Sequence, residues 1–148
     1  MRNIPAKMVR INLIDPHALS DQHLVAEYNE ILMLLGYVRK YPSLEGIPLH
    51  FRLGDGHIRF FKDKLGYIGK RHARISEEMK RRGFAVNRRA DIGIYPRAYR
   101  KDFVPTEADR RVIRERIAWK LRAKRGFYRY YGRVEDVQVL VGKVMHAG

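Results

Sequence analysis

The amino-acid sequence predicts an all-α fold, a single compact domain of three main helices joined by long loops. Apolar residues recur at helical spacing in three segments, at 20–35, at 57–82 and from 106 onward. Strand-like alternation holds for more than a few residues only in the tail, VQVLVGKV. A length of 148 residues suits one domain with a modest core.

The first helix is predicted to begin after Ser20, a good N-cap residue, and to stop at Gly36. Its buried stripe is formed by Leu24, Tyr28, Ile31 and Leu35. His23, Glu27 and Glu30 share another face of this helix. That face is acidic in a strongly basic protein.

The second helix is predicted over residues 57–82 and is closed by Gly83. Gly66 and Gly69 lie inside it, and they indicate either close packing or a break. Residues 84–105 are predicted to be irregular.

The third helix is predicted to start at Thr106, with Asp109 in the reciprocal position of a capping box, and to end near residues 127–133. The apolar valines of the tail, residues 134–148, either cover a helix or form an oligomer contact. The sequence leaves both readings of the tail open.

The net charge of +15 is concentrated in one part of the chain. Residues 1–56 are balanced, and the whole excess of Lys and Arg falls between residues 57 and 133. Such a block is typical of a protein that neutralises phosphates, so nucleic acid is favoured as the partner over a merely solvated basic surface.

Several classes of protein are excluded or disfavoured. The chain has no cysteine, which excludes disulfides and thiolate chemistry, and its six histidines show no metal-binding spacing. We therefore expect no metal and no cofactor. No apolar run approaches the ~18–20 residues of a membrane helix, and the start MRNIPAKMV lacks an apolar signal segment. We expect a soluble, cytoplasmic, nucleoid-associated monomer, or one in the host-cell cytoplasm if the protein is viral.

The motif FYRYYGR, residues 127–133, places four aromatic rings beside Arg129 and Arg133. Aromatic rings stack on exposed bases while guanidinium groups hold phosphates, but the same rings also suit the packing of helix ends. Glu30 and His23 are equally ambiguous by themselves, since most helix glutamates are solvated and a lone histidine more often caps a helix.

Five blocks in register make a more specific pattern: RINLID...LSDQHLVAEYNEI, LGDGHIRFFKDKL, KRRGF, DFVPTEAD and FYRYYGR. From about Val9 to Arg133 the chain resembles the bacteriophage pyrimidine-dimer DNA glycosylases, the ultraviolet-repair family called endonuclease V. The resemblance implies an all-helical enzyme acting on double-stranded DNA that contains ultraviolet photoproducts. Such an enzyme cuts the glycosidic bond at the 5′ pyrimidine of a cyclobutane dimer and then nicks the strand by β-elimination.

The resemblance also implies the site residues. The nucleophile would be the α-amino group of Val9, and the essential carboxylate would be Glu30. An α-amine has a pKa of ~7.7–8.0 against ~10.4 for lysine, so part of it is unprotonated at neutral pH. The implied substrate- and DNA-binding residues are Arg10, Gln22, His23, Arg116, Tyr128, Arg129, Tyr130, Tyr131 and Arg133.

The chain departs from the family pattern at three places. Asn29 and Met33 stand where the family has arginines, which bears on lesion preference. Residues 134–148 continue past the family's usual end, and residues 1–8 precede Val9. The predicted division is therefore an N-terminal extension at 1–8, a glycosylase-like domain at 9–133 and a C-terminal extension at 134–148.

The N-terminal extension decides whether the Val9 amine is free. A start at Met8 allows methionine removal before the small Val9 and exposes the amine, and this is the reading we favour. A start at Met1 blocks it and leaves Met1's own amine, Lys7 or no imine at all. Two other functions stay open: a glycosylase and lyase for other damaged bases, or a non-catalytic nucleic-acid-binding protein on the same scaffold.

Overall fold

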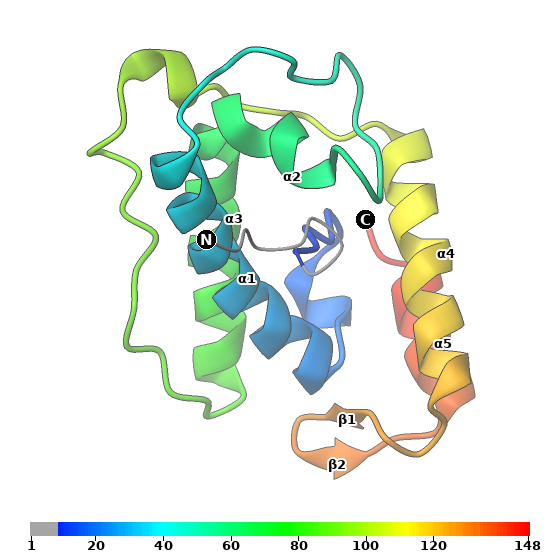
Figure 1. The fold of residues 1–148 in the computed structure, drawn as a ribbon. Helices are drawn as coiled ribbons and strands as arrows, with labels where there is room; N and C mark the ends of the chain where they lie inside the picture. The colour runs from blue at the N-terminus through cyan, green and yellow to red at the C-terminus, as the bar shows by residue number, and fades with distance from the viewer. Residues whose placement is uncertain (1–8) are drawn as a thin grey trace.

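A computed structural model describes residues 9–148 (Figure 1). These residues form five α-helices: α1 (Asp21–Lys40), α2 (His57–Phe60), α3 (Leu65–Arg81), α4 (Glu107–Ala123) and α5 (Val137–Met145). A two-stranded antiparallel hairpin, β1 (Arg129–Tyr130) and β2 (Arg133–Val134), joins α4 to α5. The prediction of an all-α fold is confirmed, whereas the prediction of three main helices is not. None of the described helices is long and apolar enough to cross a membrane.

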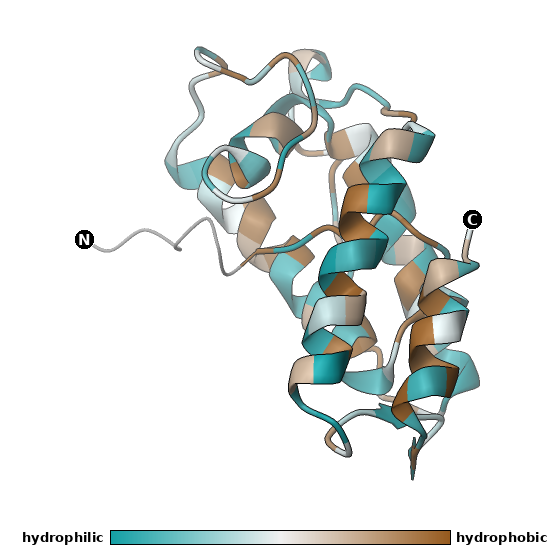
Figure 2. Ribbon diagram, turned by 90° about the vertical axis from the view of Figure 1, so that its right-hand side faces the viewer, coloured by the Kyte–Doolittle hydropathy of each residue, from teal (hydrophilic) through white to brown (hydrophobic). Residues whose placement is uncertain are grey.

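The helices lie in two groups with the first described residues between them (Figure 1). Helices α1 and α3 pack against each other on one side, and α4 and α5 pack together on the other. Residues 9–14 run through the core between the groups, and Val9, Ile11 and Ile14 are fully buried. Hydrophobic and hydrophilic bands alternate along α4 and α5 (Figure 2), and Ile113, Ile117 and Leu121 of α4 are buried.

Helix α1 begins as predicted and runs further than predicted. The Oγ atom of Ser20 accepts a hydrogen bond from the backbone N–H of His23 at 3.2 Å. The helix does not stop at Gly36 but continues to Lys40, because Leu35 and Val38 are buried on the same face. Burial of two large side chains outweighs the ~1 kcal/mol that a glycine costs inside a helix.

The long second helix is broken. Helix α2 passes into a 3-10 turn (Phe61–Asp63), and Lys64 leaves the helical conformation before α3 starts. The break lets a distant loop pair with the chain, since Lys64 forms a bridge with Arg100. A Cβ atom at Gly66 would lie 2.6 Å from the carbonyl oxygen of Arg100, so close approach of this loop requires the glycine.

Helix α4 carries the predicted capping box between Thr106 and Asp109. The tail forms helix α5, so the strand-like pattern was misleading there. Its apolar residues also fit a helical period, and Leu140, Val141 and Val144 are buried where α5 packs on α4. Val141 and Val144 of the tail therefore cover a helix, whereas Val134 and Val139 are exposed.

Candidate active site

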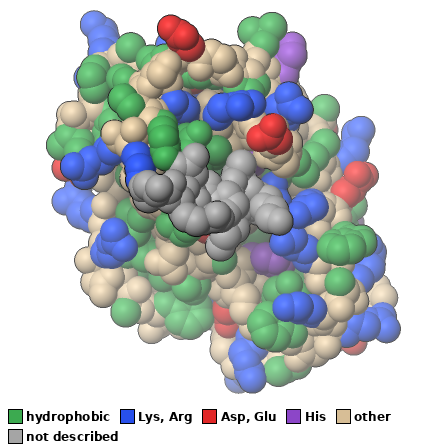
Figure 3. Space-filling model, viewed as in Figure 1, with side chains coloured by type: hydrophobic (Ala, Val, Ile, Leu, Met, Phe, Trp, Pro, Cys, Tyr) green, Lys and Arg blue, Asp and Glu red, His purple; other side chains and the backbone are tan. Residues whose placement is uncertain are grey.

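One pocket brings together six of the residues that the sequence singled out. It has a volume of about 210 Å³ and opens between the start of the described chain, helix α1 and helix α4. Its walls include Arg10, Gln22, His23, Glu30, Arg116 and Tyr128. Val9 is the residue next to Arg10 and is fully buried. Figure 3 shows many Lys and Arg side chains on this face of the molecule.

Glu30 is held directly against the backbone of the N-terminal segment. Its Oε1 atom accepts a hydrogen bond of 2.7 Å from the backbone N–H of Arg10. Burial raises the pKa of Glu30 to about 7, although the bond from Arg10 opposes this shift. A carboxyl group with this pKa can act as a charged stabiliser and as a proton donor or acceptor near neutral pH.

Residues 11 and 12 are held by the side chains of His57 and Glu27, which the sequence did not single out as site residues. The backbone N–H of Ile11 donates to Nε2 of His57 at 3.0 Å, so His57 donates from Nδ1 to the carbonyl oxygen of Arg52 at 2.9 Å. Burial lowers the pKa of His57 to about 4, which keeps it neutral as this geometry requires. Asn12 donates to Oε1 of Glu27 at 3.0 Å.

Glu27, one turn before Glu30, has a structural role. Its carboxylate lies against the fully buried guanidinium of Arg71, with Nε to Oε2 at 2.8 Å and Nη2 to Oε1 at 3.0 Å. A charged pair removed from water in this way is retained only with good geometry and further hydrogen bonds, which Asn12 supplies here. The acidic face of α1 therefore contains one paired carboxylate and one, Glu30, that faces the pocket.

Three cations surround Glu30. Arg10, Arg116 and Lys120 all line the pocket. Burial and then mutual repulsion lower the pKa of Arg10 and of Lys120, while Glu30 acts in the opposite direction on both. Within residues 9–148, Nη1 of Arg10 and Nε of Arg116 are buried without a hydrogen-bond partner. Buried donors without partners are costly, and an anionic oxygen that reached these two atoms would satisfy them.

Lys120 was missed among the many basic residues of the sequence. The available signal was its spacing, because it lies one turn after Arg116 on the same face of α4.

The side wall of the pocket is the loop that leads into the hairpin. Gln22 holds this loop through both ends of its amide, donating to the carbonyl oxygen of Phe127 at 2.8 Å and accepting from the N–H of Arg129 at 2.9 Å. The ring of His23 stacks on Tyr128 with centroids 4.8 Å apart. Burial, followed by repulsion from Lys120, lowers the pKa of His23 to about 4. Gln22 and His23 thus shape the wall that faces Glu30.

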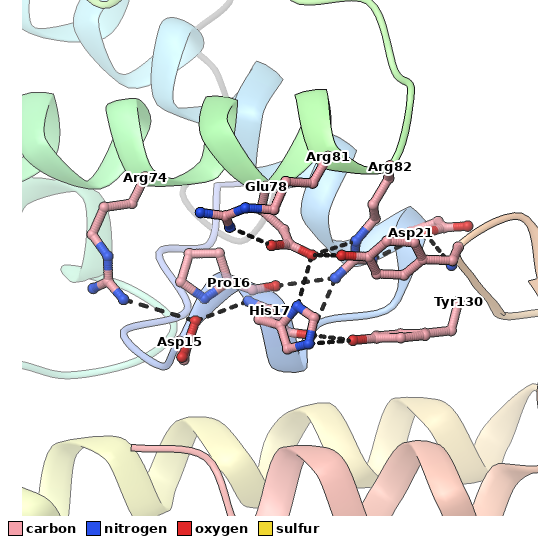
Figure 4. Close-up of polar contacts among 10 residues, drawn as sticks. Asp15, Pro16, His17, Asp21, Arg74, Glu78, Arg81, Arg82 and Tyr130 are labelled. Carbon is pink, nitrogen blue, oxygen red and sulfur yellow. Dashed lines mark hydrogen bonds and ion pairs between the residues drawn. The ribbon is translucent and has the colours of Figure 1, made fainter.

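The rest of the hairpin docks at the C-terminal end of helix α3 (Figure 4). The guanidinium of Arg82 lies under the rings of Tyr130 and Tyr131, at 4.6 and 4.8 Å from their centroids. It also pairs with Asp21 at 3.0 Å and with Glu78 at 2.9 Å. We call these five residues the hairpin clasp.

Both carboxylates of the hairpin clasp, those of Asp21 and Glu78, accept several hydrogen bonds. Asp21 accepts from the backbone N–H groups of Tyr131 and Gly132 at 3.0 and 2.8 Å. Burial alone would raise the pKa of Glu78, but hydrogen bonds from Arg82, Tyr131 and others outweigh it and lower the pKa to about 2. Tyr130 and Tyr131 therefore contact other parts of the protein, while Phe127, Arg129 and Arg133 are exposed.

The two positions that depart from the family pattern lie on α1. The side chain of Asn29 is exposed and donates to the carbonyl oxygen of Val25 at 3.2 Å, and Met33 is partly buried. Residues 1–8, which include Met1, Lys7 and Met8, lie outside the described residues. The predicted extension at 1–8 and the choice of start site therefore stay predictions.

An all-α fold with a basic pocket around a partly protonated carboxylate is suited to an enzyme that acts on DNA. A family model described as pyrimidine dimer DNA glycosylase matches residues 8–92, more than half of the chain. The chain belongs to this family, as the sequence blocks predicted. It is a DNA-repair glycosylase, and its substrate is DNA. The matched residues include Val9, Arg10 and Glu30 and end before α4 and the hairpin.

Proposed function

We propose that the chain cleaves the glycosidic bond at the 5′ pyrimidine of a cyclobutane dimer and then nicks the strand, through an imine on the α-amine of Val9. The amine attacks C1′ of the sugar as the glycosidic bond breaks, and the electron pair of that bond goes to the base. The C1′–O4′ bond then opens with proton transfer to O4′, which leaves an imine between C1′ and the amine nitrogen. The imine nitrogen acidifies the C2′ proton, and its removal expels the 3′ phosphate by β-elimination. The single observation that carries this proposal is the 2.7 Å bond between Glu30 and the Arg10 N–H, one residue from Val9.

The pocket suits an amine nucleophile. A free α-amine has a pKa of ~7.7–8.0, and three cations nearby favour its neutral, nucleophilic form. The same nitrogen inside a peptide bond is an amide and cannot attack. The proposed chemistry therefore requires an active form in which Val9 is the first residue.

Glu30 has two tasks in this mechanism. As a carboxylate it stabilises the positive charge that develops on the sugar when the base leaves. Because its pKa is raised to about 7, it also exchanges protons readily during imine formation and elimination. Arg10, Arg116 and Lys120 bind the phosphates on either side of the reacting sugar, and the unpartnered donors of Arg10 and Arg116 support this role.

Borohydride trapping on ultraviolet-irradiated duplex tests the proposal. The chain of residues 1–148 is compared with one that starts at Val9, undamaged duplex is the control, and peptide mass mapping locates any adduct. We expect a DNA adduct on the Val9 amine of the shorter chain only. An adduct on Lys7 or Met1 would move the chemistry to another amine. No adduct in either chain, together with tight binding, would favour a non-catalytic binding protein.

A second candidate function is a glycosylase and lyase for other damaged bases. Asn29 favours it, since its amide donates to α1 itself where the family pattern has an arginine. Parallel cleavage assays on dimer-containing, oxidised and abasic duplexes separate the two functions. Cleavage of the dimer duplex alone supports the first, and efficient cleavage of oxidised duplex supports the second.

A further inference from the structure

The single tryptophan of the chain, Trp119, lies in the C-terminal half of helix α4 and is 65% exposed. Its indole makes no hydrogen bond, ring contact or cation–π contact with any residue between 9 and 148. Large aromatic side chains usually pack in the interior or at interfaces. An isolated, exposed indole on a rigid helix is therefore available to a partner.

Trp119 lies on the helix that forms one wall of the pocket. Arg116 and Lys120, on the same helix, both line the pocket. At about 100° per residue, Trp119 is rotated by roughly 60° from Arg116, toward solvent and away from the buried face of α4. The indole consequently lies on the solvent side of this wall.

The surface around Trp119 is basic. Exposed cations follow it on the same helix and just beyond its end, at Arg122, Lys124 and Arg125, and Lys and Arg side chains gather over α4 in Figure 3. Glu115 is the acidic residue one turn before it. A partner that fits this surface carries many negative charges and a flat apolar face. Nucleic acid has both, whereas an apolar protein partner would have to bury these cations.

We propose that Trp119 stacks on a base that is exposed where the duplex is opened at the pocket. Stacking of this kind requires an unstacked base or a gap in the duplex, which an intact helix does not present. The proposal rests on the proposed function, because that function is what opens the duplex beside Glu30. It goes beyond it by assigning a DNA contact to a residue outside the pocket.

Fluorescence of the only tryptophan tests this contact directly. The full chain is titrated with a fluorescein-labelled duplex that contains a tetrahydrofuran abasic analogue, which cannot form an imine. Anisotropy of the label reports binding, and a parallel titration with unlabelled duplex reports quenching of Trp119. We expect strong quenching at saturation with the abasic-analogue duplex and weaker quenching with an intact duplex.

Variants separate stacking from mere proximity. Trp119→Ala should weaken binding of the abasic-analogue duplex by about 10-fold, with Trp119→Phe in between, while the salt dependence of binding stays unchanged because no charge is lost. Ile94→Ala is the matched control, since Ile94 is 63% exposed on a loop beside Pro96 and Tyr99 rather than at this pocket. It should bind like the unaltered chain.

The outcomes distinguish the two proposals. If anisotropy shows binding but the fluorescence of the unaltered chain is not quenched, the stacking contact is overturned. It is also overturned if the unaltered chain is quenched but Trp119→Ala binds the duplex with unchanged affinity. Both results leave the glycosylase function standing. A fluorescence change that depends on protein concentration without DNA overturns it in favour of self-association. Absence of any DNA binding overturns both proposals.

Discussion

At the residue scale, Glu30 is a partly buried carboxylate that, among the described residues, lacks the tight ion pair that Glu27 has. It accepts from the Arg10 N–H, but the three cations around it do not form an ion pair with its carboxylate among the described residues. Glu27, three residues earlier, is tightly paired with Arg71. The difference separates a carboxylate held for structure from one held for chemistry, since perturbed and incompletely paired groups cluster at active sites.

The first prediction concerns the charge of Glu30. Glu30→Gln keeps the acceptor for the Arg10 N–H but removes the charge that stabilises the sugar in the transition state. The rate of glycosidic-bond cleavage should fall by at least about 100-fold, while binding of the damaged duplex survives. Single-turnover assays of glycosidic-bond cleavage and anisotropy measure the two quantities. Glu115→Gln, at an exposed site on α4, is the control, and loss of binding together with activity in a folded Glu30→Gln protein would contradict the role.

The second prediction follows from the pKa of Glu30, which is about 7 in the folded protein against 4.5 for an ordinary glutamate. The stabilising contribution of the protonated form is complete below pH 4.5 and is lost as pH rises through about 7. Glu30→Gln avoids this loss. Its Tm should match that of the unaltered chain near pH 4 and exceed it by a few degrees at pH 8, as measured by thermal unfolding. Equal Tm values at both pH values would count against a buried, uncompensated charge.

The candidate site was predictable residue by residue only in part. Arg10, Glu30, His23 and Arg116 were named from the resemblance to the family, and the structure brings all four to one pocket. His57 was not named, because its hydrogen bond to the Ile11 N–H spans 46 residues and leaves no periodic signal in the sequence. Contacts between distant backbone and side-chain atoms depend on the tertiary fold, which local patterns do not encode.

At the element scale, the hairpin is fixed to α3 by the hairpin clasp. The sequence left two roles open for the aromatic residues of the hairpin, which could pack helix ends together or stack on bases. Tyr130 and Tyr131 lie on Arg82, whereas Tyr128 forms the pocket wall with His23. One short motif therefore serves two purposes, and Tyr131, with a φ of 52°, lies in the turn of the hairpin.

The third prediction tests the hairpin clasp. The side chain of Arg82 is fully buried, and Arg82→Ala leaves the carboxylates of Glu78 and Asp21 without their shared cation. Unfolding in urea should show a loss of about 3–5 kcal/mol. Arg81→Ala is the matched control, because Arg81 is 63% exposed and its single pair with Glu78 is worth less than about 1 kcal/mol. Similar losses for both variants would show that the clasp does not depend on Arg82.

The fourth prediction separates two glycines that look alike in the sequence. Gly66→Ala places a Cβ 2.6 Å from the carbonyl oxygen of Arg100, and the backbone cannot yield cheaply, so stability should fall by about 1–3 kcal/mol. At the exposed position 36 of α1, the Cβ atom added by Gly36→Ala meets nothing within 4 Å, so the free energy of unfolding should rise by about 0.5–1 kcal/mol. Chemical denaturation of both variants checks the opposite signs. A gain for Gly66→Ala would mean that the loop at 100–101 can move away.

The same two glycines explain where prediction of the elements failed. Glycine marks a weak point in a helical pattern, but whether the helix continues depends on what packs against it. At Gly36 the buried Leu35 and Val38 carry the helix on, whereas near Gly66 a loop 34 residues away along the chain pairs at the break. Element type was predictable from periodicity, and element ends were decided by tertiary contacts.

At the scale of the whole molecule, charge and fold act together. The excess basic residues of 57–133 are distributed over α3, α4 and the loops. Some of them line the pocket together with residues of 1–56, the segment whose positive and negative charges balance. Arg10 comes from the balanced part and Arg116 and Lys120 from the basic part. Composition therefore predicted nucleic acid as the partner, but only the fold brings these three cations to Glu30.

The fifth prediction uses salt to count the phosphates bound at this pocket. Each phosphate that a cation neutralises releases counterions, so the logarithm of affinity falls with the logarithm of salt by about 0.9 per contact. Arg116→Ala should reduce this slope by about 1 and weaken binding of all duplexes alike, as measured by anisotropy over a range of salt concentrations. Arg89→Ala is the control, because residue 89 is exposed on the loop that follows α3, across the molecule from α4 (Figure 1). Equal slopes for the Arg116 variant and the unaltered chain would mean that the unpartnered Nε of Arg116 does not face a phosphate in the complex, and the pocket would then hold the sugar without its flanking charges.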